Sequence, residues 1–594
     1  MLEYDVRLID LNRHLFEVQC HVPNPDQEQF LSMPSWIPGS YLLREFARHV
    51  TTIYAEDEDG PVGLEKLSKN TWICRNSGRK LIVTMEVFAF DASVRGAFLD
   101  ASRGFFNGTC LFLSVSGREQ TPSKVRLIKP KDVRCKNWRV ATAMRPVKIN
   151  DAGFGTYEAT NYDELIDHPM ELSEHSEIAF EAADIPHRLV IAGLHRADKK
   201  RLAEDLKLLC EAHIDFFGAP PPFKNYLFLG LAVGNGYGGL EHRASSSLIF
   251  CRDDLPKNDQ VGISKDYQRF LSLCSHEYFH AWNVKRIKPK AFIPYRLDQR
   301  RHTRLMWVFE GITSYYQDLM LLRSKLINTE EYLARLGQLL TRVYRSPGRF
   351  TQSLADASFD AWDKLYKPDV NSRNATISYY SKGALVALAL DLTLRKESSS
   401  TLDQIMQVLW ERFGQNEVGL AEDEFESLSQ EISSLNLSDF FDTSIRGTKD
   451  IPLQALMKEF AIDFQLRHES DGDATDLPRK ENHQKLDLGV CAKPSMNGLE
   501  ITEVIHDGPA DQAGLNPGDV LIALGGLRID QSGISRRLER FNAGETVSVA
   551  VFRDDELKEF DVTLVEGIKH TCILRFNNES GDEAVDRRKS WIGN

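Results

Sequence analysis

One stretch of the chain combines residue types and a spacing that can bind a metal ion and activate water. Residues 276–280 read H-E-Y-F-H, an H-E-x-x-H sequence, and apolar residues continue a helical pattern on both sides. Residues four apart lie on one face of a helix, so His276 and His280 can reach a single ion. Glu277 lies beside them and can hold a water molecule and take its proton. The rest of the chain is expected to supply further ligands and the substrate geometry.

A second helical stretch supplies a candidate third ligand. The apolar-periodic run 303–326 contains Glu310, thirty positions after His280 (310 minus 280). A carboxylate among apolar neighbours is costly if it is buried unpaired, and a zinc ion removes that cost. Two histidines and one glutamate with an open position are typical of a catalytic zinc, and Glu277 can deprotonate the water at that position. These residues predict one zinc ion per chain and hydrolysis of peptide bonds.

The surrounding elements predict a multidomain α+β protein. The 594 residues are too many for one hydrophobic core, at roughly 150 residues per domain. Short alternating apolar runs favour antiparallel strands in the first part, and apolar-periodic helices with a buried strand at 226–233 follow. The expected division is an all-β domain at 1–182, a mainly α catalytic domain at 183–467, a polar linker at 468–485, a small β-rich domain at 486–567 and a loose tail at 568–594.

Composition limits the partners. The formal net charge of -13 argues against nucleic acid, because neutralising phosphates needs surplus Lys and Arg. The chain shows neither a signal-peptide pattern nor an apolar run long enough to span a bilayer, so a cytoplasmic protein without membrane contact is expected. The nine cysteines never form C-x-x-C, which predicts buried thiols, Cys274 included, in a reducing compartment. Whether the protein forms a homo-oligomer stays open.

Three loops carry residues whose roles the pattern leaves open. The proline-rich loop 33–41 is interpreted as a packed corner. The segment 167–171 contains a His and a Glu, for which solvated loop charge is the simpler interpretation. The glycine-rich segment 234–242 lets backbone approach a ligand closely, and Glu241 would present a carboxylate at the edge of the strand before it.

Five motifs together make the chain similar to a known family, the glycyl aminopeptidases with a C-terminal PDZ domain, which are distant relatives of aminopeptidase N within the gluzincins. The motifs lie at residues 34–41, 238–242, 276–286, 307–316 and 377–383. The resemblance implies an N-terminal β domain and a thermolysin-like catalytic domain. It also implies removal of N-terminal residues from peptides, with glycine and alanine preferred.

The resemblance carries over to the glycine-rich loop. Gly238 to His242 matches the G-x-M-E-N exopeptidase loop of the superfamily, with Leu240 and His242 in place of Met and Asn. It implies that Glu241, supported by Gly238 and Gly239, binds the α-amine of a substrate with a free N-terminus. An anionic carboxylate near the zinc selects a free ammonium and fixes which peptide bond lies over the metal.

Further roles are implied in the same way. The segment that begins with Tyr380 matches Y-E-K-G, whose tyrosine hydroxyl stabilises the tetrahedral intermediate, so Tyr380 is the expected oxyanion donor and Tyr379 its rival. Thermolysin has an Asp four positions after its ligand Glu, where this chain has Ser314, which leaves the support of the zinc histidines open. By analogy with how the superfamily lines its pocket, Glu171 is an additional candidate contact for the amine.

The segment 508–526 resembles a bacterial-type PDZ domain. The resemblance implies that Leu488, Gly489 and Val490 form the loop whose backbone N–H groups receive the C-terminus of a peptide ligand. A structural β module that binds no peptide is the alternative.

Two alternative functions remain on the sequence alone. In the first, the zinc site is that of an endopeptidase and Glu241 is structural. In the second, the chain is an adaptor recruited through its PDZ domain, with an idle protease fold. The intact Glu277 argues against the adaptor, because an idle site has no need of its base.

Overall fold

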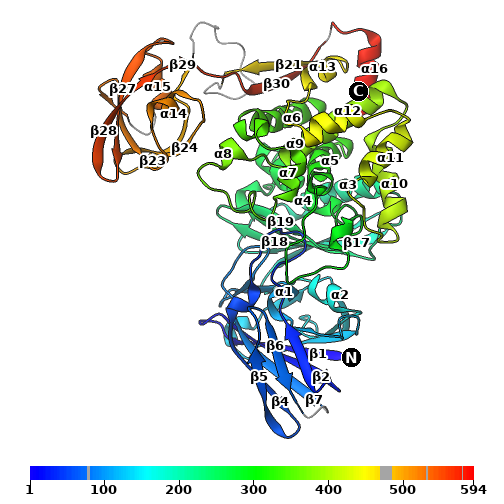
Figure 1. Ribbon diagram of the computed structural model, residues 1–594. Helices are drawn as coiled ribbons and strands as arrows, with labels where there is room; N and C mark the ends of the chain where they lie inside the picture. Colours follow the sequence, from blue (N-terminus) through cyan, green and yellow to red (C-terminus); the bar gives the residue numbers. More distant parts are fainter. Residues whose placement is uncertain (77–79, 469–484, 530–532, 578, 594) are drawn as a thin grey trace. The chain divides into compact units, whose positions relative to one another are not determined.

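The computed structural model describes all residues except 77–79, 469–484, 530–532, 578 and 594, and it divides into two compact units (Figure 1). The first unit comprises Met1–Thr303, Tyr316–Ile327 and Asp403–Phe425, and the second comprises Arg304–Tyr315, Asn328–Leu402 and Glu426–Asn594. The predicted fold class is confirmed: an all-β N-terminal part, a mainly helical catalytic part and a C-terminal PDZ domain. Nearly all of the predicted linker falls on 469–484, outside the described residues.

The N-terminal part of the first unit contains two sheets, as the alternating apolar runs predict. The larger sheet has the order β10 (Ser114–Val115), β3 (Glu28–Ser32), β6 (Thr71–Arg75), β5 (Gly60–Lys66), β4 (Val50–Asp57), β7 (Lys80–Phe88), β2 (Leu15–Pro23), β1 (Leu2–Asp10), β11 (Ser123–Leu127), β14 (Gly155–Ala159) and β13 (Arg145–Ile149). The smaller sheet has the order β12 (Arg139–Ala141), β15 (Met170–Ser173), β9 (Arg103–Phe106) and β8 (Ala97–Leu99). Alternate residues of β2 are buried, because successive side chains of a strand point to opposite faces.

A five-stranded sheet follows in the same unit. Its order is β16 (Ser176–Ala182), β17 (Ile185–Ala192), β18 (Tyr226–Val233), β20 (Ser245–Cys251) and β19 (Tyr237–Glu241). β18 is the predicted apolar strand and pairs in parallel with a strand on each side, which explains why most of its residues are buried. β19 is the edge strand and ends at Glu241. β16, which precedes the expected boundary at residue 182, pairs with β17 of this sheet.

Two capped helices accompany the sheet. α3 (Lys199–Phe217) begins after Asp198, whose carboxylate accepts from two backbone N–H groups of the first turn. α4 (Lys265–Phe279) begins after Ser264, whose hydroxyl accepts from the N–H of Tyr267. α4 contacts β19 and β20, so the H-E-x-x-H sequence and Glu241 are held by neighbouring elements.

One helix belongs to both units. It begins as a π-helix, η5 (Trp307–Gly311), and continues as α5 (Ile312–Arg323), and the division between the units falls after Tyr315. A π-helix contains an extra residue per turn and is often found at functional sites. Glu310 lies in this widened turn.

The second unit is largely helical. Its helices are α6 (Thr329–Tyr344), α7 (Leu354–Phe359), α8 (Ser372–Ala375), α9 (Ser381–Glu397), α11 (Glu424–Ser433), whose first two residues belong to the first unit, α12 (Ser438–Phe441) and α13 (Leu453–Lys458). α10 (Leu402–Leu409) belongs to the first unit except for Leu402. η5 and α9 cross at two glycines: a Cβ added at Gly311 would lie 2.6 Å from the Cα of Gly383. This close crossing brings the start of α9, which follows Tyr380, against the turn that carries Glu310.

The PDZ domain, also in this unit, has a small hydrophobic core of its own. Its sheet has the order β23 (Val490–Ser495), β24 (Gly498–Val504), β25 (Val520–Leu524), β27 (Thr546–Arg553) and β28 (Glu556–Thr563), with helices α14 (Pro509–Ala513) and α15 (Ile534–Leu538). The Asn374 amide in α8 donates to the carbonyl of Val504 at 2.8 Å and accepts from the N–H of His506 at 3.1 Å. The sheet is thereby bonded to the helical part of its unit.

The predicted loose tail at 568–594 is wrong over most of its length. β30 (Thr571–Phe576) pairs with β21 (Ile462–Arg467), and α16 (Asp582–Ile592) follows it. Trp591 is 2% exposed, and its indole N–H donates to the hydroxyl of Tyr315 at 2.9 Å. The polar composition concealed this because only two residues at the end of the helix, Trp591 and Ile592, are buried.

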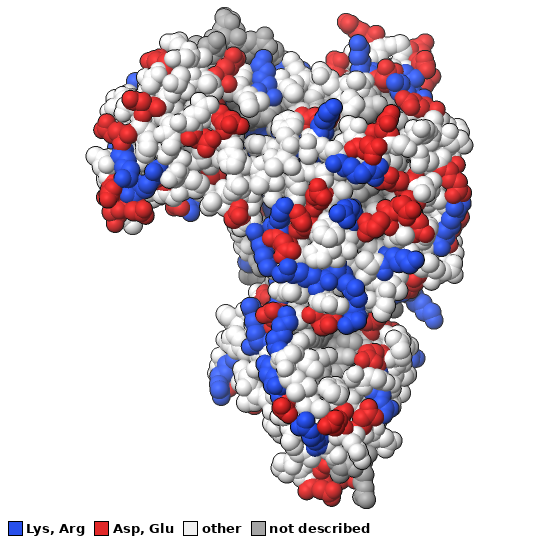
Figure 2. Space-filling model, in the orientation of Figure 1, with Lys and Arg blue, Asp and Glu red and all other residues white. Residues whose placement is uncertain are grey.

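Other predictions from composition can be compared with the structure. All nine cysteines are free, and seven of them, including Cys274, are buried. Among the described helices, none combines the length and the apolar character needed to cross a membrane. Figure 2 shows acidic and basic side chains interspersed over the face that it draws.

Candidate active site

His276 in the last turn of α4 and His280, the residue that follows the helix, have ring nitrogens that lie close together. The ring Nδ1 of His276 lies 2.8 Å from Oε1 of Gln317, and Nδ1 of His280 lies 2.7 Å from the backbone carbonyl of Asn283. A carbonyl oxygen can only accept, so each Nδ1 carries the hydrogen, and the lone pair of a neutral ring is then on Nε2. Both Nε2 atoms are thereby prepared as ligands.

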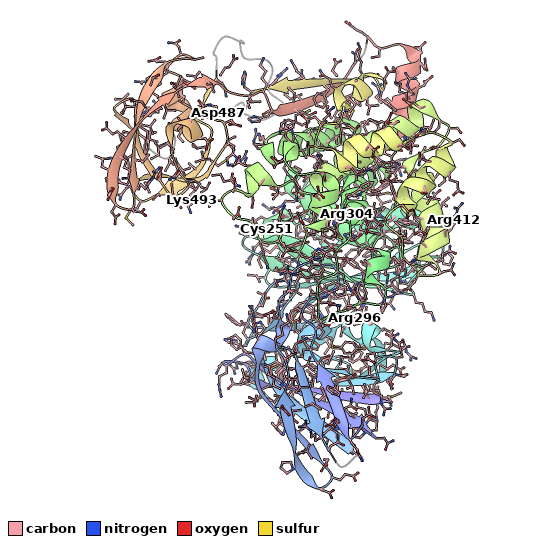
Figure 3. All side chains as sticks on the ribbon, viewed as in Figure 1. Cys251, Arg296, Arg304, Arg412, Asp487 and Lys493 are labelled. Atoms are coloured by element: carbon pink, nitrogen blue, oxygen red, sulfur yellow. The ribbon has the colours of Figure 1, made fainter. Side chains whose placement is uncertain are left out.

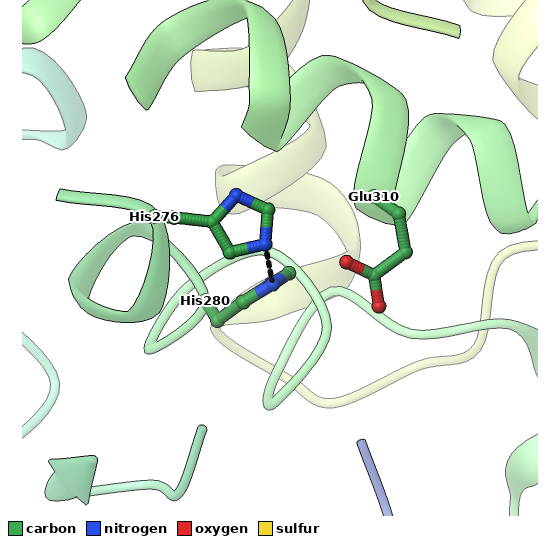
Figure 4. A group of neighbouring side chains, drawn as sticks. All are labelled: His276, His280 and Glu310. Atoms are coloured by element: carbon green, nitrogen blue, oxygen red, sulfur yellow. Dashed lines mark hydrogen bonds between the residues drawn. The ribbon is translucent and has the colours of Figure 1, made fainter. Parts of the chain in front are cut away.

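The spacing of these two nitrogens fits a zinc ion. They lie 3.1 Å apart, and the dashed line of Figure 4 joins them. Two nitrogens at zinc-ligand distance in a tetrahedral site would lie about 3.3 Å apart. Two lone pairs at this separation repel each other, and a cation bound by both removes the repulsion.

Glu310 completes the candidate ligand set. One carboxylate oxygen of Glu310 and one ring nitrogen of each histidine all lie within 4.8 Å of one another. Figure 4 shows the carboxylate on its own helix, directed toward the two rings. Glu310 and His280 are buried, at 2% and 1% exposed, whereas His276 is half-buried. The two-His, one-Glu set has the donor chemistry of a catalytic zinc site.

Gln317 supports the ring of His276, a role for which the sequence, with Ser314 in place of an Asp, offered no candidate. It bonds His276 from the helix that carries Glu310, seven residues further along. Seven residues are about two turns, so Glu310 and Gln317 lie on the same face of that helix. An amide here orients the ring of a ligand histidine, as a carboxylate does in other zinc sites. The two-turn spacing was visible in the sequence, but an amide at this position is not specific enough to be recognised.

Glu277 lies against a glycine of the edge strand. It is 5% exposed, and a Cβ on Gly239 of β19 would overlap its carboxylate. Gly239 therefore has a packing role in the site, since only glycine leaves room for the side chain of Glu277. The neighbouring Gly238 is more open: the only contact of a Cβ added there would be a guanidinium nitrogen of Arg95 at 4.0 Å, among the described residues outside its immediate chain neighbours.

Glu241 is a buried carboxylate with unused hydrogen-bonding capacity. It is 3% exposed, and its Oε1 has no hydrogen-bond partner within the described part of the chain. Ligand atoms of Glu241, Glu277 and His280 all lie within 4.8 Å of one another. Two carboxylates at that distance repel each other by roughly 3 kcal/mol at an effective dielectric constant of 20. The arrangement favours a cation beside Glu241.

The two residues that follow Glu241, His242 and Arg243, belong to a buried ionic network around Asp167, which corrects the expectation of solvated charge at 167–171. Asp167 is 9% exposed; it pairs with Nζ of Lys285 at 2.6 Å and with Nδ1 of His242 at 3.5 Å, and it accepts from the N–H of Arg243 at 2.8 Å. Burial raises the pKa of Asp167, but Lys285 and then His242 outweigh it and hold the pKa well below its usual range. The sequence alone does not predict this network, because the residues that contact Asp167 lie far from it along the chain.

Glu171 is buried too, and its carboxylate is already bound. Nε of Arg103 donates to its two oxygens at 3.1 and 2.9 Å, and the Ser173 hydroxyl donates to it at 2.7 Å. Nη2 of Arg103 lies 2.8 Å from the same carboxylate. A substrate amine would have to displace Arg103, so the geometry does not favour the amine contact that was predicted for Glu171.

Tyr380 and Tyr379 differ in exposure. Tyr380 is half-buried and its hydroxyl lies 2.9 Å from that of Tyr366, whereas Tyr379 is fully buried and stacks on the Tyr380 ring. Burial, followed by the charge of Glu310, raises the pKa of Tyr380 well above its usual value. Tyr380 therefore keeps its proton and can donate a hydrogen bond.

The residues predicted to bind a peptide C-terminus lie before and at the start of β23. Leu488 is 1% exposed within the PDZ core, and the N–H of Gly489 donates to Oδ1 of Asp487 at 2.9 Å. Val490 begins β23, which is the first strand of the sheet order and therefore an edge strand. A peptide strand can add to such an edge.

The loop 33–41 is a packed corner, as predicted. Trp36 is fully buried, and its indole N–H donates to the carbonyl of Arg296 at 3.0 Å. Arg296 is labelled in Figure 3. The Trp36 ring also contacts those of Phe292 and Tyr295. This corner connects the N-terminal part of the first unit to the segment that follows α4.

Three family profiles match the sequence: the Peptidase M61 N-terminal domain at residues 3–174, the M61 glycyl aminopeptidase at 269–386 and the PDZ domain at 486–564. Among solved structures, an aminopeptidase N family protein from Idiomarina loihiensis is 38% identical, with a TM-score of 0.95 and 100% of both chains covered. The M1 zinc metallopeptidase from Deinococcus radiodurans is 13% identical, with a TM-score of 0.49 over 76% of this chain and 94% of that one. A search of curated proteins gave no match.

The fold and the site define a metallopeptidase. The chain belongs to the M61 glycyl aminopeptidase family, and it carries a PDZ domain.

Proposed function

We propose that the protein is a zinc aminopeptidase that removes one residue at a time from peptides with a free N-terminus, with glycine or alanine preferred. The observation that carries the proposal is Glu241, a buried carboxylate with an unpartnered oxygen, whose ligand atom lies within 4.8 Å of those of Glu277 and His280. A primary ammonium supplies the positive charge and the hydrogen-bond donors that this carboxylate needs.

His276, His280 and Glu310 would hold one zinc ion, which when bound polarises the scissile carbonyl and acidifies water. Gln317 and the carbonyl of Asn283 fix the ring orientation of the two histidines.

The remaining steps belong to side chains of this protein. Glu241 accepts hydrogen bonds from the substrate ammonium and so fixes which peptide bond is attacked. Glu277 takes a proton from the attacking water and passes it to the leaving nitrogen. The Tyr380 hydroxyl donates to the oxygen that becomes negative in the tetrahedral intermediate.

The PDZ domain is proposed to bind the C-terminus of a peptide partner along the free edge of β23, through the backbone of the 488–490 loop.

The deciding experiment measures metal content and compares two peptides that differ only at the N-terminus. Purified protein is expected to contain zinc and to cleave Gly- and Ala-peptides with a free amine, but not the same peptides after acetylation. Cleavage of the acetylated peptides would favour the endopeptidase. No zinc, or no cleavage of either, would contradict the proposal and favour the adaptor.

A further inference from the structure

The tip of the packed corner is a tight turn whose geometry requires glycine. The N–H of Ser40 donates to the carbonyl of Ile37 at 3.0 Å, and the two residues between them are Pro38 and Gly39. Gly39 has a φ of +94°. Proline in the second position and a positive φ in the third are the features of a type II turn.

This turn touches the side chain proposed to bind the substrate amine. A Cβ built on Gly39 would lie 2.5 and 2.6 Å from the two oxygens of Glu241 and 2.7 Å from its Cδ. Carbon atoms in contact are normally about 3.5–4.0 Å apart, so any side chain here would displace the carboxylate. Gly39 therefore lies directly on one side of the Glu241 carboxylate, whose other neighbours include Glu277 and His280.

The turn is fixed in place by contacts of the residues before it and after it. Before it, the N–H of Ser35 donates to the carbonyl of Leu297 at 2.6 Å, and the buried Trp36 bonds Arg296. After it, the ring of Tyr41 stacks on that of Phe292, with 5.8 Å between centroids. A methyl group at position 39 would therefore move Glu241 rather than the turn.

We propose that the Ile37–Ser40 turn is the specificity wall of the amine subsite. Gly39 is a positioning residue that keeps the Glu241 carboxylate close to Glu277 and His280, and the backbone of the turn lies against that carboxylate. The subsite then has room for an unsubstituted primary ammonium and excludes one that carries an alkyl or acyl group. This inference rests on the proposed amine-binding role of Glu241.

The test is the variant Gly39→Ala, with Gly117→Ala as its matched control. Gly117 also has a positive φ, +78°, lies in the same N-terminal part, and has nothing within 4 Å of an added Cβ. Both variants carry the strain of alanine at positive φ, but only Gly39→Ala meets Glu241. With a glycine anilide as substrate, Gly39→Ala is expected to raise KM about tenfold or more, the effect of weakening a hydrogen bond to a charged group. kcat and zinc content should change little, and Gly117→Ala should keep the wild-type KM.

A second variant separates displacement of Glu241 from general damage. Glu241→Asp shortens the side chain by one methylene and withdraws the carboxylate from Gly39. In Gly39→Ala/Glu241→Asp, the shorter carboxylate leaves room for the methyl group, so its KM should lie well below the value expected from multiplying the two single effects. Multiplicative effects, or a wild-type KM in Gly39→Ala, would overturn the inference.

The same assays distinguish failure of this inference from failure of the proposed function. Wild-type protein should prefer glycine anilide over both N-methylglycine anilide and the analogue that lacks the amine. If it shows no such preference, both ideas are wrong. If the wild type discriminates and Glu241→Asp weakens the discrimination while Gly39→Ala leaves it intact, only the role of the turn is wrong.

Discussion

Two buried glutamates of the first unit have opposite surroundings. Glu171, 2% exposed, is bonded by Arg103 and Ser173. Glu241, 3% exposed, has an oxygen without a partner in the described part of the chain and lies close to another carboxylate, Glu277. Both charges are withdrawn from water. Within the described residues, both oxygens of Glu171 accept hydrogen bonds, whereas Oε1 of Glu241 accepts none.

The difference supports a structural role for Glu171 and the proposed ligand-binding role of Glu241. A buried charge destabilises a protein unless it is paired and hydrogen-bonded. The Arg103–Glu171 pair satisfies this requirement during folding. Under the proposed function, the ammonium of the substrate compensates Glu241, so that binding offsets the free-energy cost of burying this carboxylate.

The largest effect is expected from a substitution of the third buried glutamate, Glu277, and the effects at Glu171 and Glu241 can be compared with it. Glu277→Gln keeps the shape of the side chain but cannot carry the proton, so kcat should fall by about 10²- to 10⁴-fold. Zinc content and the KM for a free-amine substrate should stay near wild type. A variant that keeps its activity would place the base elsewhere.

Glu171→Met should reduce stability and leave specificity alone. It removes one partner of a buried ion pair and leaves Arg103 uncompensated, which typically costs about 3–5 kcal/mol of unfolding free energy. Urea unfolding measures the loss, and peptide cleavage by the remaining folded protein should keep its preference for a free amine. Arg103→Met/Glu171→Met is the control and should recover most of the stability. Loss of amine preference in Glu171→Met would instead support the amine contact predicted from the family resemblance.

Glu241→Gln should give the reverse pattern. The charge-assisted hydrogen bonds to the ammonium are lost, which corresponds to a rise in KM of about 10- to 100-fold. The unfolding free energy should stay the same or increase, because an uncompensated charge near Glu277 has been removed. Marked destabilisation would mean that Glu241 is paired within the fold, and the contrast with Glu171 would fail.

The smallest effect is expected from a substitution of Asp167 in the buried ionic network. Since the folded protein holds the pKa of Asp167 well below its usual value, ionised Asp167 contributes stability above the unfolded pKa of about 3.9, and this is lost as the pH falls through the folded value. Unfolding free energy measured from pH 5 downward should therefore decrease less steeply in Asp167→Asn than in the wild type. Parallel curves would show that Asp167 has no such linkage.

Local patterns predicted most of the chemistry. The four-residue spacing of His276 and His280 needs only a helix, and the continuous apolar run 226–233 needs only a buried sheet, because both follow from backbone periodicity. The family motifs added Glu241 and Tyr380. The polar composition of 582–592 led to the wrong prediction of a loose tail, because composition does not reveal that Trp591 is buried against the rest of the fold.

The sequence by itself determined the candidate metal ligands, the candidate base and the order of the domains. Only the tertiary structure decided that Gln317 orients His276, that Asp167 and Glu171 are buried in ion pairs, and that Gly39 lies on Glu241. The physical reason is distance along the chain. Helical and strand periodicities act over a few residues, whereas the partner that satisfies a buried charge, or the glycine that makes room for it, can come from any segment that folding brings to the same place.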